Sequence, residues 1–84
     1  MSVWISVQDV DYENTLSTLE VFWTKEDAVK FTQQLIDEEH LPSGYSYRKT
    51  DDGDIVEWQR GKIRDKKWMT SDISYVVYKK EVIG

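Results

Sequence analysis

The feature that most constrains this fold is a change of hydrophobic period at Thr24. Before that residue, Val3, Ile5 and Val7 repeat at every second position, which is the pattern of a half-buried strand. After it, four apolar residues recur at the spacing of one helical face: Ala28, Phe31, Leu35 and Ile36. The sequence therefore predicts one amphipathic helix in a chain that is otherwise made of strands.

The helix is predicted to begin after Thr24 and to end near Glu39 or His40. Thr24 is a suitable N-cap, and Asp27 stands three residues later in the capping-box position. The helix does not extend much further because Pro42 disfavours helical geometry in the residue before it.

Two strands are predicted before the helix. Leu19, Val21 and Trp23 repeat at every second position, and a polar loop separates them from the first strand. Because the two strands are close in sequence, they are predicted to pair antiparallel.

Two or three strands are predicted after the helix. Tyr45–Thr50 and Ile55–Arg60 flank the turn D-D-G-D, and a last strand begins at Ile73. Gly61 is interpreted as a bulge or bend, with Lys62–Lys66 as a second connection. The predicted fold class is α+β, with a single helix packed on a mostly antiparallel sheet of four or five strands in the order ββαβββ. At 84 residues, the whole chain (1–84) is expected to be one domain.

Composition argues against several kinds of chemistry. The chain has no cysteine, which excludes disulfides, thiolate catalysis and the common structural zinc sites. His40 is the only histidine, no G-x-S-x-G motif is present, and the four glycines are dispersed rather than gathered in a phosphate loop. We therefore expect no enzyme activity and no cofactor. The N-terminus lacks the basic and apolar regions of a signal peptide, so a cytoplasmic location is expected.

The loop D-V-D-Y-E-N-T-L-S-T-L-E has the acidic spacing of a calcium-binding loop. Asp9, Asp11 and Glu13 match its first three ligand positions, and Glu20 matches the last. However, Asn14 stands where such loops need glycine, and the flanking segments are predicted strands rather than helices. We expect an acidic solvated loop and no metal.

Charge is divided unevenly along the chain. Residues 1–42 hold nine acids and two bases, whereas residues 43–84 hold seven acids and nine bases. Five of the eleven basic residues lie in the stretch E-W-Q-R-G-K-I-R-D-K-K-W-M, from Glu57 to Met69. The stretch can be a nucleic-acid contact, a protein interface or a solvated hairpin. Its candidate partner-binding residues are Trp58, Arg60, Lys62, Arg64, Lys67 and Trp68.

The predicted helix supplies a second candidate surface. Glu26 lies in its first turn, and Asp37 and Glu38 lie at its C-terminal end, where negative charge opposes the helix dipole. This unfavourable interaction with the helix dipole indicates a cationic neighbour in the fold or a basic partner.

The run F-W-T-K-E-D-A, from Phe22 to Ala28, has the form F-x-[ST]-x-E-x-A at a junction between strand and helix. With the N-terminal strand and polar loop before it, the first half of the chain resembles small uncharacterised αβ proteins of bacteria and their phages. The resemblance implies a bacterial or phage origin and an accessory or regulatory role. It implies no catalytic residues.

The leading functional hypothesis is a small acidic protein-binding module without enzyme activity. It would be a phage or mobile-element accessory protein that binds and inhibits a host protein, for example one that binds nucleic acid. The alternative is a nucleic-acid-binding domain that uses the basic segment 58–68, although the net charge of −5 weakens that attraction. Neither hypothesis involves a membrane, and both are compatible with a homodimer.

Overall fold

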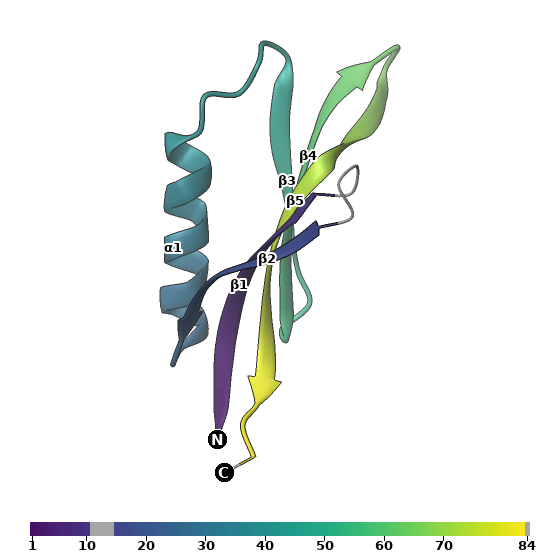
Figure 1. Cartoon of the computed structure of the whole chain (residues 1–84). Helices are drawn as coiled ribbons and strands as arrows, with labels where there is room; N and C mark the ends of the chain where they lie inside the picture. Colours follow the sequence, from purple (N-terminus) through teal and green to yellow (C-terminus); the bar gives the residue numbers. More distant parts are fainter. Residues whose placement is uncertain (11–14, 84) are drawn as a thin grey trace.

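The computed structural model describes residues 1–10 and 15–83, which form one helix and one five-stranded sheet (Figure 1). The elements are β1 (Ser2–Val10), β2 (Thr15–Phe22), α1 (Lys25–Glu38), β3 (Tyr45–Asp51), β4 (Ile55–Arg64) and β5 (Lys67–Glu81). The sheet order is β2-β1-β5-β4-β3, and every neighbouring pair is antiparallel. The α+β class and the order ββαβββ are confirmed, with five strands.

The helix lies on one face of the sheet (Figure 1). Ser6 identifies that face, because its hydroxyl is 2.7 Å from the hydroxyl of Thr32 on α1 in a buried hydrogen bond. Phe22 of β2 packs against Phe31 of α1 on the same side, with ring centroids 5.2 Å apart. Since side chains alternate along a strand, Val3, Ile5 and Val7 belong to the opposite face. We call that opposite side the open face, because no helix or strand of the described chain lies across it.

The core lies between α1 and the middle of the sheet. Its fully or nearly buried members are Ala28, Ile36, Val56, Trp58, Tyr75 and Val77. Trp58 is the largest of them and only 1% exposed. Its indole N–H donates to Oε1 of Gln33 on the helix at 2.9 Å, so its polar atom is satisfied inside the core.

The predicted helix boundaries are confirmed to within a residue or two. Thr24 is the N-cap, and its hydroxyl accepts a hydrogen bond from the backbone N–H of Asp27 at 3.2 Å. The last helical residue is Glu38, and Glu39 caps the C-terminus in an extended conformation.

A bulge in β2 changes which of its residues reach the helix. Ser6 pairs with Glu20 but Val7 pairs with Thr18, so Leu19 is an extra residue in that strand. Leu19 and Phe22 both pack against the core, which a strict two-residue alternation does not allow. The predicted alternation in this segment is therefore interrupted.

The bulge predicted at Gly61 is confirmed, because the register between β4 and β5 shifts between Gln59 and Gly61. The predicted connection Lys62–Lys66 and the predicted start of the last strand at Ile73 are wrong: β4 continues to Arg64, β5 begins at Lys67, and only Asp65 and Lys66 connect them. Both residues have positive φ angles, 53° and 63°, as a two-residue hairpin turn of the I′ type requires. Gly61 is retained for a packing reason, because a Cβ there would lie 2.5 Å from the carbonyl oxygen of Met69.

We expect the hydrogen bond between Ser6 and Thr32 to couple the helix to the sheet. Thr32→Val leaves the buried Ser6 hydroxyl without this partner and should lower the free energy of unfolding by about 1–3 kcal/mol. In the Thr32→Val background, Ser6→Ala should lower the free energy of unfolding much less than it does in the native chain, because both polar groups are then gone. Urea denaturation of the two single variants and the double variant measures the coupling. Thr50→Val, at an exposed position, is the control, and strict additivity of the two substitutions would contradict the coupling.

Candidate functional site

The hairpin between β4 and β5 projects beyond the rest of the sheet (Figure 1). Pairing of β3 with β4 stops at Lys62, and pairing of β1 with β5 stops at Ile73. Between those points, within the described residues 1–10 and 15–83, the two strands pair only with each other. We call this two-stranded segment, Ile63–Asp72, the arm.

The tip of the arm combines positive charge with exposed apolar side chains. Arg64, Lys66 and Lys67 are all exposed around the turn. Ile63 is 68% exposed and Met69 is 50% exposed on the two strands beside them. Arg64 and Lys67, both predicted as partner-binding residues, are therefore accessible at one place.

Arg60 and Lys62 lie at the base of the arm and are only half-buried. Both approach the ring of Tyr45, at 5.6 and 5.2 Å from its centroid. Arg60 also donates from Nε to the hydroxyl of Ser71 at 2.9 Å, and its Nη1 lies 3.8 Å from the carboxylate of Glu39. The guanidinium of Arg60 thus joins strands and helix within the fold, whereas Lys62 retains more freedom.

The two predicted tryptophans point to opposite faces of the sheet. Trp58 faces the helix and is buried, so it is not available to a partner. Trp68 packs on Gly61 on the open side, and the guanidinium carbon of Arg48 lies 4.2 Å from its ring centroid. The residues that flank the basic segment therefore do not form a pair of stacking planes.

The C-terminal end of the helix finds its cationic neighbour within the fold. Glu39 accepts a hydrogen bond from the hydroxyl of Tyr47 at 2.5 Å and faces Arg60. Burial, followed by this hydrogen bond and the charge of Glu39, raises the pKa of Tyr47 far above its ordinary value. Burial also raises the pKa of Tyr75, whose ring lies 6.0 Å from that of Tyr47. Both phenols therefore remain neutral at physiological pH.

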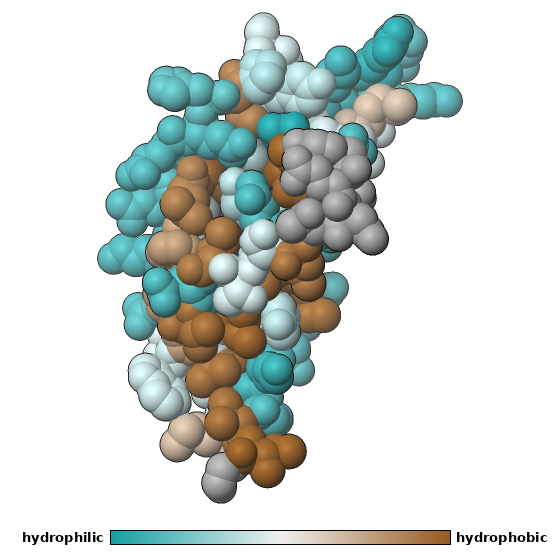
Figure 2. Space-filling model, in the orientation of Figure 1, coloured by the Kyte–Doolittle hydropathy of each residue, from teal (hydrophilic) through white to brown (hydrophobic). Residues whose placement is uncertain are grey.

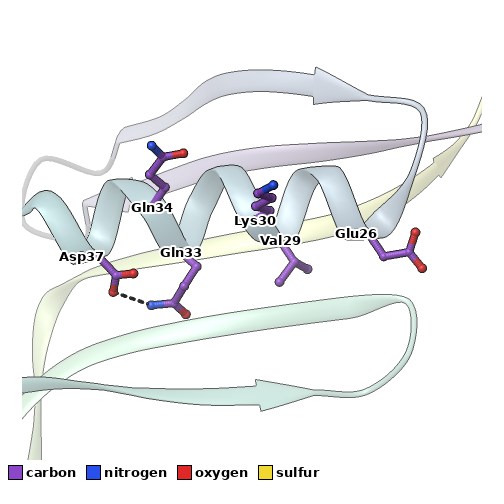
Figure 3. A pocket seen from close by; sticks show the side chains of 6 residues that line it. All are labelled: Glu26, Val29, Lys30, Gln33, Gln34 and Asp37. Atoms are coloured by element: carbon purple, nitrogen blue, oxygen red, sulfur yellow. Dashed lines mark hydrogen bonds between the residues drawn. The ribbon is translucent and has the colours of Figure 1, made fainter.

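The acidic helix residues line a groove beside the β3–β4 hairpin. Figure 3 shows Glu26, Val29, Gln33 and Asp37 projecting from α1 toward that hairpin. The groove has a volume of about 580 Å³, and its lining is completed by Lys30 and Gln34. Asp37 accepts a hydrogen bond from the amide of Gln33 at 2.9 Å, and Glu38 is exposed. The three predicted acidic residues thus lie on the helix but not on the arm, at a separate surface.

Sequence reasoning missed the open face. The strand register places apolar residues of four adjacent strands on it; those still accessible are Val3, Leu16, Val21, Ile55, Val76 and Tyr78. Ile5 and Val7 lie among them and are nearly inaccessible. Figure 2 shows hydrophobic residues that run through the middle of the molecule down to the end that carries the chain termini, and mostly hydrophilic residues at the arm. The available signal was the aliphatic set Val3, Ile5 and Val7, which shows that one side of β1 needs cover but not whether the helix supplies it.

The acidic loop that was compared with a calcium-binding loop is only partly described: Asp11, Glu13 and Asn14 lie outside the described residues. Among those described, no cluster of three or more potential ligands could hold a metal ion. Likewise, no helix in the described ranges has the length and apolar character needed to cross a membrane.

Comparison of the chain with protein-family models, curated proteins and solved structures finds no match. The geometry of the arm, the groove and the open face is therefore the basis for the functional proposal below.

We expect Gly61→Ala to destabilise the base of the arm. The new Cβ would lie 2.5 Å from the Met69 carbonyl oxygen and 2.7 Å from Cζ2 of Trp68, so backbone or ring must move. The free energy of unfolding should fall by about 1–3 kcal/mol, and Trp68 fluorescence should change. Ser46→Ala, at the exposed position paired with Gly61 on β3, is the matched control and should change stability by less than about 0.5 kcal/mol. Equal stabilities of the two variants would contradict the packing argument.

Proposed function

We propose that this chain is a non-enzymatic protein-binding module that contacts its partner through the arm. The observation that carries the proposal is the exposure of Met69 on the same side of the arm as Arg64 and Lys67, with Ile63 exposed on the other side. A hydrophobic residue beside arginine is typical of the few contacts that dominate the energy of protein interfaces. The partner surface is therefore an acidic one with an apolar recess.

The positions of Trp58 and Trp68 favour a protein over single-stranded nucleic acid as the partner of the basic segment. Proteins that bind single strands stack successive bases on accessible aromatic rings. Trp58 is 1% exposed, and Trp68 is held between Gly61 and Arg48. The exposed side chains of the tip are instead aliphatic, thioether and cationic.

The acidic residues of the helix are a second contact in this proposal. Glu26 and Asp37 line the groove, Glu38 is exposed beside it, and all three lie on a different element from the arm, so they would meet a basic part of the same partner. The first half of the chain resembles small αβ proteins of bacteria and their phages. In this proposal the partner is accordingly a host protein that the module inhibits. A host protein that binds nucleic acid has such a basic surface.

Affinity capture from a lysate of the native host, with nuclease treatment, tests the arm as the contact. The bait is the full chain, compared with the variant Ile63→Thr/Met69→Thr, and captured proteins are identified by mass spectrometry. We expect a protein that survives nuclease treatment, with affinity reduced at least about tenfold by the variant.

The matched control is Val82→Thr/Ile83→Thr, which makes the same kind of change at two exposed apolar residues far from the arm. It should capture the protein as the native chain does. Equal capture by all three baits, or no nuclease-resistant protein, would contradict the proposal.

A nucleic-acid-binding function is the second candidate, favoured by Arg64, Lys66 and Lys67 at the tip of a two-stranded ribbon. A two-stranded ribbon fits the major groove of duplex DNA, and cations there would contact phosphates. Titration of labelled duplex and single-stranded DNA and RNA at low salt tests this. Lys66→Gln/Lys67→Gln should then lower the slope of log affinity against log salt by about 2. Lys79→Gln/Lys80→Gln, with the same net charge, should bind normally, and flat titrations would eliminate this candidate.

A further inference from the structure

The open face retains apolar side chains that neither the helix nor the strands cover. Leu16 is 66% exposed, and Val21 and Ile55 are each 49% exposed. The register places them on one face: Val21 and Ile55 lie on either side of Ile5, which is only 9% exposed, and Tyr78, which is half-buried. Exposed apolar side chains gathered on one face of a sheet indicate an interaction surface.

The amount of exposed surface matches what one more subunit would cover. The molecule exposes 6059 Å² at a mass of 10.0 kDa. A compact monomer of that mass exposes roughly 5,200 Å². The excess is about the area that each partner contributes to an interface of standard size, ~800 Å².

Charge identifies the kind of partner. Strand alternation places three acids and two bases of the described sheet on the open face: Asp9, Glu57, Asp72, Arg48 and Lys80. The face thus carries a net charge of only −1 in a chain of net charge −5. Two identical acidic chains that approach through this face meet little like charge, whereas their helix sides would repel. A strongly charged partner, by contrast, would find no complementary field here.

We propose that the open face is the interface of a homodimer, in which the sheets of two copies pack face to face. Packed sheets lie about 10 Å apart with strand directions about 30° from parallel, so the apolar side chains of the two copies interdigitate. The two-fold axis makes the contact isologous, and the two acidic helices lie on the outside of a four-layer α/β/β/α particle. This inference does not depend on the arm as the site for a further partner. The dimer would nonetheless carry two arms and so offer two contacts to one further partner.

Sedimentation velocity of the full chain over about 1–100 μM tests the dimer. We expect a species of twice 10.0 kDa that dissociates on dilution. Val21→Lys/Ile55→Lys should raise the dissociation constant at least ~100-fold, because it buries unpaired charge in the contact. Met69→Lys, at an equally exposed residue on the other side of the sheet, is the matched control and should leave the dimer intact. Far-UV circular dichroism checks that each variant is folded.

A measurement without substitutions keeps the inference testable if the double variant does not fold. A mixture of isotopically labelled and unlabelled chains should give intermolecular nuclear Overhauser effects at Val21, Ile55 and Val76. A monomer at every concentration would overturn the proposal. A dimer whose intermolecular contacts lie only at the arm or at the β2 edge would also overturn it. The same holds if these methyl groups become buried only when a different protein binds.

Discussion

The rest of the structure depends on the fact that one helix has to cover a five-stranded sheet. A helix of 14 residues is about 21 Å long and ~10 Å wide, and five strands at ~4.8 Å spacing are about twice that width. α1 packs on β1, β2 and β5. The helix-side surface of β3 and β4 is therefore covered by aromatic and long polar side chains, and no helix covers the open face.

That constraint explains where the unusual side chains lie. Trp58 fills the space between α1 and β4, with its N–H on Gln33 and the ammonium of Lys49 5.4 Å from its ring centroid. Beyond the end of the helix, Arg60 and Tyr47 meet Glu39 and close the core with a network of charge and hydrogen bonds. The basic segment is therefore split. Its base belongs to the fold, and only its tip is free to bind.

The local elements could be predicted because their signals are local. The Thr24 cap, the helical stripe and the D-D-G-D turn each depend on neighbours a few residues away, and all three are found. The bulge at Leu19 and the continuation of β4 through Gly61 could not be predicted in this way. Each results from pairing with a strand distant in sequence: the bulge is fixed by the register on β1, and Gly61 is required by the ring of Trp68 on β5. Trp58 and Trp68 look equivalent in the sequence, but the register assigns them to opposite faces.

The sequence by itself determined the order of the elements, their number to within one strand, and the charge of the two halves of the chain, because periodicity and composition act within single segments. The tertiary structure decided which alternating set of β1 meets the helix. Ser6 pairs with Thr32, so the more uniformly aliphatic set of Val3, Ile5 and Val7 lies on the face that the helix leaves uncovered. It also decided that Arg64, Lys66 and Lys67 project on an arm while Arg60 is held in the core network. The physical reason is the same in both cases. A side chain's surroundings are set by the register of strands far apart in sequence and by the single helix, which can cover only one face.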